Sequence, residues 1–570
     1  MQRLRSALLS MDHKSYPAYK GLRGSYQFSR YQLNIDHVQG DPFAAPSRVS
    51  VEISGKQAGF PAEYYQQKHR RIALEDHLIR LFYREISALS FKAKGSGKSG
   101  LMAVSHPGQE ILERSACHID DCQGNIILRF AVGFPANGRS INARELEKIL
   151  FQYLPAAVEH ACLFARISKP DCQKVIELAD DQKYIREQMQ AEGLVAFVAN
   201  GAILPRESGV SERPMRDAVP FQSPKSMEVT WQLPHYGSIS GMGIRKGVTL
   251  IVGGGYHGKS TLLQTLEKAV YPHIAGDGRE YVMTDDSAMK IRSEDGRAIR
   301  EKDISMFIRN LPNGRDTTKF STMDASGSTS QAANVVEAIE AGSHTLLIDE
   351  DTSATNFMIR DELMERVVAA GAEPIVPFIK RVRGLYAHRG ISTVLVAGSC
   401  GAFFHVADTI LQMENYLPYE ITEQAKKAAE DYPLNFDPEE ETEYPDTERQ
   451  TRIPEMRPAK AGRDGRERQA KIKTMGTDGF QINKETVDLR YLEQITDGEQ
   501  MMAIAKLLDG ILKKHAGKQI RLSKVLDQIM NDLEEKGFAG MPGGAGLLDM
   551  AMPRRYEVAG CVNRIVDGKW

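Results

Sequence analysis

Long apolar runs are absent from this sequence, and so is any strong excess of charge of one sign. No stretch approaches the ~20 apolar residues that a helix needs to cross a bilayer, and the first residues are charged and tyrosine-rich, without the apolar core of a signal peptide. We therefore expect a cytoplasmic protein without a membrane segment. The 73 basic and 75 acidic residues give a formal net charge of −2, so any nucleic acid or membrane must bind a local patch rather than the overall field.

Cysteine is also scarce. Six cysteines in 570 residues do not make the framework of a disulfide-dense secreted domain. Two groups contain potential zinc ligands, namely Cys117, His118 and Cys122, and then His160, Cys162 and Cys172. Their spacings are not those of paired zinc knuckles. We interpret them as separate reduced thiols in cores and loops, with a zinc site as the alternative.

Glycine is concentrated in one loop, which is the most informative feature of the chain. The apolar run 248–252 before this loop predicts a buried strand, and residues 262–266 after it predict a helix. A strand, Gly-x4-Gly-Lys-Ser and a helix together form a phosphate-binding loop in its required context. The loop consists of Gly253, Gly254, Gly255, Tyr256, His257, Gly258, Lys259, Ser260 and Thr261.

This loop predicts ATP and Mg²⁺ as ligands. Backbone N–H groups of the glycines and the N-terminus of the helix would bind phosphate oxygens. Lys259 would reach the β- and γ-phosphates, and Ser260 would hold Mg²⁺. The alternative is a glycine-rich turn without a ligand.

A second apolar strand, 345–348, ends in two carboxylates. We expect Asp349 to hold Mg²⁺ through water and Glu350 to polarise or deprotonate the attacking water. Hydrolysis needs these two roles side by side at the C-terminal end of a strand that faces the phosphates. The alternative is a strand that simply meets solvent at an acidic turn.

Residues 324–331, followed by a helical stretch to Ala341, resemble the signature motif of ABC-class ATPases, Leu-Ser-Gly-Gly-Gln. Ser326 and Gly327 match the Ser-Gly of that motif, and Ser328 replaces its second glycine. Residues 351–356 resemble the D-loop of the same class. In ABC proteins the signature contacts the γ-phosphate held by the opposing subunit, so the resemblance implies a homodimer with two composite sites. An ordinary helix N-cap is the alternative for Ser326–Ser328.

Two departures from the ABC pattern affect the expected function. ABC transporters carry a Gln between the phosphate loop and the signature, and the sequence has none from residue 265 to 330. Asp303 or Asn310 could substitute for it. ABC ATPases also carry a His after the last core strand, where this chain has 398–401, Gly-Ser-Cys-Gly; His405 comes several residues later. These differences disfavour coupling to the membrane domain of a transporter.

Most of residues 15–420 resembles one group in particular, the predicted ATPases of the ABC class. The resemblance implies a soluble ATPase that is not a transporter, and one branch of the group is tied to RNA binding in mitochondrial RNA editing. ABC sites also use an aromatic residue upstream of the phosphate loop, for which Tyr236 is a candidate. Besides the loop and the signature, the segments that carry the resemblance are 41–48, 195–201, 241–244 and 276–280.

We expect an α/β fold in four parts. Residues 1–225 would form an N-terminal α/β domain, and 226–420 the ABC-type ATPase core. Residues 421–475, first acidic and then basic, would form a linker or interaction arm. Residues 476–570 would form a mainly helical C-terminal domain. Within the core, we expect a β-hairpin over 289–300 around the turn Glu-Asp-Gly-Arg.

Two basic segments are candidates for nucleic-acid binding, because lysine and arginine neutralise backbone phosphates without reading sequence. Residues 92–99 imitate a second phosphate loop, but a lysine stands in place of the first glycine, and we expect a flexible basic loop. The alternative for residues 92–99 is a solvated surface loop. The alternative for the second segment, which contains Arg466, Arg468 and Lys471, is a charge-balanced linker. The candidates are Lys92, Lys94 and Lys98, and then Arg466, Arg468 and Lys471.

The sequence therefore predicts a homodimeric ABC-class ATPase that is coupled to nucleic acid, with single-stranded RNA favoured over DNA. An ATP-dependent protein-assembly factor is the alternative. A transporter subunit is disfavoured.

Overall fold

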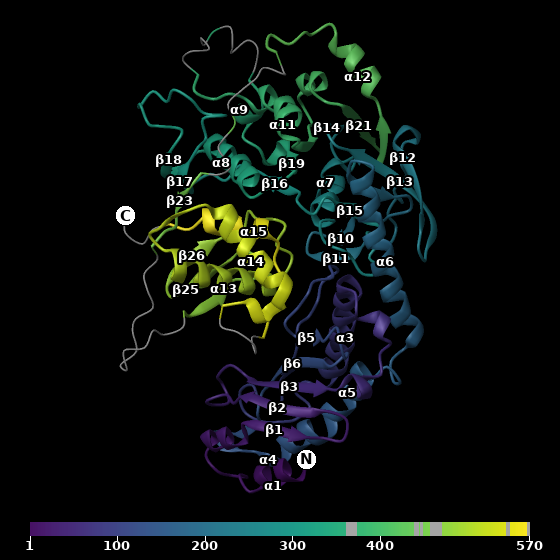
Figure 1. Ribbon diagram of the computed structural model, residues 1–570, viewed down its shortest axis with the longest axis vertical. Coiled ribbons are helices and arrows are strands. Elements are labelled where there is room, and N and C mark those ends of the chain that lie inside the picture. Colours follow the sequence, from purple (N-terminus) through teal and green to yellow (C-terminus); the bar gives the residue numbers. More distant parts are fainter. Residues whose placement is uncertain are drawn as a thin grey trace. The chain divides into compact units, whose positions relative to one another are not determined.

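The computed structural model describes residues 1–360, 367, 373–437, 444, 449–455, 470–542 and 548–566. The chain forms two compact units (Figure 1): Met1–Lys183 with Gly543–Met552, and Tyr184–Pro542 with Pro553–Trp570. Among the described residues, no helix has both the length and the apolar character needed to cross a membrane.

The first unit is built on an antiparallel sheet in the order β1-β2-β3-β6-β4, with β5 also paired to β6. Inward and outward residues alternate along β6, so one face of this strand supplies the core. The helices α3 and α5 pack against each other, and Phe82 of α3 meets Phe130 of β6 with ring centroids 5.2 Å apart. The strands are β1 (Gly24–Gln27), β2 (Gln32–His37), β3 (Ser47–Ile53), β4 (Met102–Ala103), β5 (Cys117–Ile119) and β6 (Ile126–Val132), and the helices are α3 (Lys68–Leu89) and α5 (Leu154–Cys162).

The second unit contains a six-stranded sheet in the order β16-β19-β20-β14-β21-β22, in which only the pair β21–β22 is antiparallel. β14 is the predicted strand before the glycine loop, and β20 lies between it and β19. Val248 and Leu250 of β14 share a buried cluster with Val382 and Leu385 of α11. The strands are β14 (Val248–Val252), β16 (Met289–Ile291), β19 (Thr345–Asp349), β20 (Ser392–Val396), β21 (Thr409–Glu414) and β22 (Leu417–Glu420); α11 is Val382–Arg389.

All five residues of β19 and of β20 are buried. Helix α7 (Lys259–Lys268) packs on these two strands, and α8 (Gly327–Glu340) packs on β16. Strands covered in this way read as continuous apolar runs, which is why the sequence predicted them without alternation.

A second sheet of this unit has the order β12-β13-β9-β15 and is antiparallel. Its strands are β9 (Leu194–Ala199), β12 (Glu228–Leu233), β13 (Gly237–Arg245) and β15 (Val282–Thr284). β9 precedes residue 226, so the unit that holds the glycine loop includes residues before the expected start of the ATPase core.

The predicted hairpin over 289–300 is wrong. β16 pairs in parallel with β19, whereas β17 (Arg297–Lys302) pairs in antiparallel with β18 (Phe320–Ala325), which leads into α8. The turn is present, since Gly296 has φ 80°. Ile291 of β16 is buried at the edge of the large sheet. The burial of this strand, rather than the local turn, therefore determines which strand it pairs with.

The C-terminal part is mainly helical, as expected, and adds a small sheet. Met501, Ile504, Leu508 and Ile511 form the buried face of α13, which begins at an N-cap where the Asp497 side chain accepts from Glu499 N at 2.8 Å. The helices are α13 (Gly498–His515), α14 (Leu522–Lys536) and α15 (Arg555–Asn563), and the antiparallel strands are β24 (Ile472–Thr474), β25 (Gly479–Ile482) and β26 (Glu485–Asp488).

Candidate nucleotide-binding site

The glycine loop joins the C-terminal end of β14 to the N-terminus of α7, as the sequence predicted. Its first glycine, Gly253, has φ 138°, and a Cβ there would lie 2.4 Å from the backbone oxygen of Met413. Gly258 has φ 95° and stands immediately before the first helical residue, Lys259. Both positions therefore need glycine. The two glycines bend the loop, which leads directly into the N-terminus of α7.

Lys259 spans the loop that it closes. Its Nζ donates to the backbone oxygens of Gly253 and Gly254, both at 2.8 Å. The ammonium group is thus already positioned over the concave backbone, where an anion would meet it. Ser260, the next residue of α7, lines a cavity that opens beside the loop. An ammonium, a hydroxyl and a helix N-terminus are the donor set that a polyphosphate with Mg²⁺ requires.

Asp349 and Glu350 follow β19 directly. Asp349 is buried, and its Oδ1 accepts from Asp351 N at 3.2 Å. Oε2 of Glu350 accepts from the backbone N–H groups of Gly398 and Ser399, at 2.5 and 3.1 Å, and its Oε1 accepts from the Ser399 hydroxyl. Since Gly398 and Ser399 come just after β20, the Glu350 carboxylate is held at the end of the strand that separates β19 from β14.

A cavity of about 780 Å³ opens beside the loop, within the range of ligand pockets. Part of its lining is polar and comes from the loop and from Asp351. The rest is mainly apolar and comes from two segments that the sequence did not indicate: residues 204–221, and the neighbourhood of the β21–β22 turn. The apolar lining residues are Leu204, Pro205, Met215, Ala218, Val219, Phe221, Met413 and Tyr416.

The segment that begins at Leu204 is fastened by a buried polar cluster. Arg206 pairs with Asp277 at 2.8 Å, and Asp277 also contacts His273 Nδ1 at 2.8 Å. Arg279 donates to the backbone oxygen of Leu204. The segment 276–280, which the sequence offered only as part of a resemblance, thus supports a wall of the cavity.

Helix α8 begins with the predicted signature. Ser326 is exposed at its N-cap, and its hydroxyl lies 3.0 Å from that of Thr329. Gln331 is fully buried and joins this helix to residues 351–356, because its Nε2 donates to the Ser353 hydroxyl at 2.9 Å and its Oε1 accepts from Ala354 N at 2.8 Å.

Within one chain, the cavity beside the glycine loop is not lined by the signature. Ser326, Gly327 and Ser328 are absent from the described residues that form its wall. A single chain therefore presents the two features at separate places.

Three family models match the chain in succession. A model for the N-terminal domain of ATPases of the ABC class matches residues 1–165, an ABC ATPase P-loop domain matches residues 168–450, and the MRB1590 C-terminal domain matches residues 471–569. The chain belongs to the ABC class of P-loop ATPases.

Two further proteins resemble this chain over part of its length. The uncharacterized protein MJ1628 of Methanocaldococcus jannaschii is 34% identical over 188 residues, which are 31% of this chain and 42% of that protein. The chain thus spans less than half of that relative. The structure of CbiO1 from Clostridium perfringens, described as part of the ABC transporter complex CbiONQ, is 15% identical, with a TM-score of 0.23 over 40% of this chain and 87% of that one.

The structure describes both places at which the sequence departs from the ABC pattern. In the segment 398–401, where ABC ATPases carry a His, the Ser399 hydroxyl donates to Glu350. Asp303 accepts from the Ser305 hydroxyl at 2.6 Å and lies 3.8 Å from Arg449. Neither Asp303 nor Asn310 is among the described residues that line the cavity.

The basic loop after α3 is ordered by hydrogen bonds. Ser96 N donates to Ala136 O at 2.8 Å, and Ser99 Oγ accepts from Ala136 N at 3.0 Å. Lys92, Lys94 and Lys98 are exposed, and the loop leads into strand β4 rather than a helix. The loop is thus basic, as expected, but held to its neighbours instead of free.

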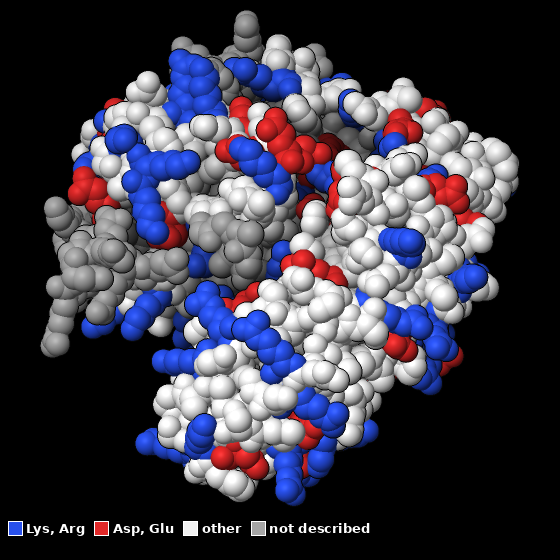
Figure 2. All heavy atoms as spheres, turned by 60° about the horizontal axis from the view of Figure 1, so that its bottom comes forward, with Lys and Arg blue, Asp and Glu red and all other residues white. Residues whose placement is uncertain are grey.

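The second basic segment is only partly described. Arg466 and Arg468 lie outside the described residues. Lys471 is exposed, and its backbone N donates to Asn483 Oδ1 at 3.2 Å beside β24. On the face drawn in Figure 2, lysine and arginine side chains form several separate groups with acidic side chains between them.

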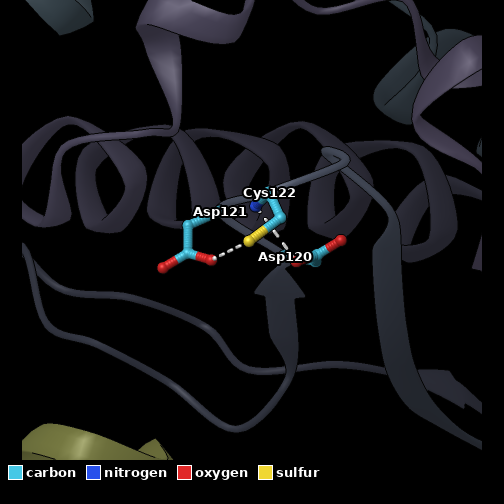
Figure 3. Close-up of side chains that lie close together, drawn as sticks. All are labelled: Asp120, Asp121 and Cys122. Atoms are coloured by element: carbon cyan, nitrogen blue, oxygen red, sulfur yellow. Dashed lines mark hydrogen bonds between the residues drawn. The ribbon is translucent and has the colours of Figure 1, made fainter.

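The two groups that the sequence offered as alternative zinc sites do not form clusters of potential metal ligands among the described residues. The six cysteines are free thiols. Asp120, Asp121 and Cys122 lie close together (Figure 3), but their polar atoms serve a turn: Asp120 accepts from Cys122 N at 3.1 Å, and the Cys122 thiol donates to Asp121. The bond to Asp121 raises the pKa of Cys122.

Proposed function

We propose that this ATPase binds ATP with Mg²⁺ and hydrolyses it at two composite sites of a homodimer, and that it couples this activity to single-stranded RNA. The position of Glu350 carries the proposal. Its carboxylate is fixed at the end of β20, between the strand of the glycine loop and the strand of Asp349. Glu350 is not among the described residues that line the cavity, but the next residue, Asp351, is, which supports a base beside the bound phosphates.

Four residues of the site have a role in this proposal. Lys259 binds the β- and γ-phosphates, and Ser260 and Asp349 hold Mg²⁺, which neutralises charge that develops on the phosphates. Glu350 orients a water and accepts its proton. Among the described groups, only the Ser399 hydroxyl donates a hydrogen bond to Oε1 of Glu350. A lone pair of this oxygen is therefore left to accept a hydrogen bond from the water.

The direct test is phosphate release from Mg²⁺-ATP by the purified chain. We expect Lys259→Ala to abolish the release and to weaken ATP binding. Release by the parent at the rate of Lys259→Ala would refute ATP hydrolysis at this site.

The homodimer is supported by the separation of the glycine loop from Ser326–Ser328. If the partner completes each site, Lys259→Ala and Ser326→Glu should each be inactive, but a mixture of the two should recover activity. In the mixed dimer, one site combines an intact loop with an intact signature. Ser326→Glu suits this test because Ser326 is exposed and a negative charge is favoured at a helix N-terminus, while it repels phosphate. A mixture as inactive as the single variants would contradict the composite site.

RNA coupling is supported by the resemblance to a family with an RNA-associated branch and by the exposed lysines of the loop 92–98. We expect salt-dependent binding of a labelled 20-nucleotide RNA. A plot of log affinity against log salt concentration has a negative slope. Replacing Lys92, Lys94 and Lys98 by alanine should make this slope less steep by about 2. The control replaces three other exposed lysines, Lys56, Lys174 and Lys246. No binding at low salt, with or without ATP, would exclude RNA, and a nuclease-insensitive protein complex would favour the protein-assembly alternative.

A further inference from the structure

We propose that Tyr416, in the turn between β21 and β22, is the aromatic platform on which the nucleobase of the bound nucleotide stacks. The inference rests on the nucleotide binding proposed above. It adds the part of the site that distinguishes a nucleotide from a bare polyphosphate.

The turn that carries Tyr416 has a backbone that normally requires glycine. Glu414 is paired with Leu417, so only Asn415 and Tyr416 connect the two strands. Their φ angles are 49° and 70°. Two positive φ values define a type I′ turn, for which Asn-Gly is the preferred sequence. A bulky residue at positive φ is strained, and such strain gathers at ligand sites.

Contacts with the phosphate loop hold this turn in place. Asn415 N donates to His257 Nδ1 at 2.8 Å. The Tyr416 ring lies against Gly258, where an added Cβ would be 3.3 Å from the ring atom Cδ1. The ring is therefore fixed relative to the phosphate loop, and 55% of the residue nevertheless remains exposed.

Tyr416 also lines the cavity, together with the apolar residues Val219 and Met215. With phosphates at Lys259 and Ser260, this apolar part of the lining is what remains to receive the rest of the nucleotide. A flat nucleobase fits between an aromatic ring and apolar side chains, and base–aromatic stacking is favourable for every base.

Tyr236, the aromatic residue that the sequence suggested for this role, is placed differently. Its ring centroid lies 4.9 Å from that of Tyr281, and Tyr236 is not among the residues that line the cavity. Tyr416 was not apparent from the sequence because it follows the phosphate loop by more than 150 residues.

The test compares ATP with inorganic tripolyphosphate, which has no base, by calorimetric titration of the full chain. Tyr416→Gly removes the ring and relieves the strained backbone. We expect it to weaken ATP binding by roughly 5- to 150-fold, to leave tripolyphosphate binding unchanged, and to keep the melting temperature equal or higher. Tyr416→Phe should bind ATP like the parent. Tyr419→Ala, on β22, and Tyr236→Ala are the matched controls, and neither should weaken ATP binding.

Parental ATP affinity in Tyr416→Gly would overturn the inference, and so would an equal loss for ATP and tripolyphosphate, because the turn would then only support the loop. Lys259→Ala separates this result from a failure of the proposed function. It should weaken both ligands; if the parent binds neither ligand, the nucleotide site itself is refuted and the inference falls with it.

Discussion

The Ser399 side chain donates a hydrogen bond to the Glu350 carboxylate from the segment 398–401, for which the resemblance to ABC ATPases implies a His. The backbone N–H groups of Gly398 and Ser399 donate to the other oxygen of the same carboxylate. Three donors thus fix one rotamer of Glu350. The segment after β20 positions the base of the proposed reaction, although it lacks an imidazole.

Ser399→Ala should lower kcat for ATP hydrolysis by roughly 10- to 150-fold and leave KM nearly unchanged. The hydroxyl orients Glu350, whereas Ser399 does not line the cavity, and loss of one hydrogen bond to a charged group corresponds to about 1.5–3 kcal/mol. Steady-state phosphate release measures both constants. Ser399→Thr keeps the hydroxyl and should retain most of the activity; if it is as slow as Ser399→Ala, the hydroxyl is not the relevant group.

Glu350→Gln should bind ATP with parental affinity, slow hydrolysis by at least about 100-fold, and accumulate as an ATP-bound dimer. The amide keeps the shape of the side chain but cannot accept a proton. Size-exclusion chromatography with ATP measures the dimer, and a quenched-flow assay the rate. Hydrolysis at the parental rate would show that Glu350 is not the base.

Gly253→Ala should destabilise the protein by about 2–4 kcal/mol and abolish ATP binding. Alanine disfavours φ 138°, and its Cβ would lie 2.4 Å from the Met413 backbone oxygen, which cannot move aside as a side chain would. Chemical denaturation measures the loss. Gly255→Ala is the matched control, because a Cβ there has no atom within 4 Å, and it should keep parental stability. Equal stability of the two variants would contradict the steric account.

The sequence was informative where function depends on consecutive residues. The glycine loop, the strand ending in Asp349 and the helix after Ser326 could be predicted because each motif is local and lies between buried apolar runs. The hairpin over 289–300 was predicted wrongly, since a turn signal does not reveal that β16 pairs with β19 instead. The cavity wall from Leu204 onward and Tyr416 could not be predicted, because they reach the loop from distant segments.

Helix α8 is tied to the C-terminal part by a buried ionic cluster. Arg564, just after α15, donates through Nε to Glu294 Oε2 at 3.1 Å and through Nη2 to Asn334 of α8 at 3.1 Å. Arg297 pairs with Glu337 of the same helix at 2.5 Å. Burial raises the pKa of Glu294, but the guanidinium groups of Arg564 and Arg297 outweigh it and lower the pKa from 4.5 to about 2.

Because the pKa of Glu294 is depressed in the folded protein, its stabilising effect is complete above the unfolded pKa near 4.5 and is lost as the pH falls toward about 2. A shift of this size corresponds to about 3 kcal/mol. Glu294→Gln should therefore be less stable than the parent at pH 7, and the difference should shrink steadily below pH 4.5 in denaturant titrations at each pH. Glu423→Gln, which changes an exposed carboxylate on another helix, should show no such difference. If the gap between Glu294→Gln and the parent is the same at pH 7 and pH 3, the cluster does not stabilise α8 through charge.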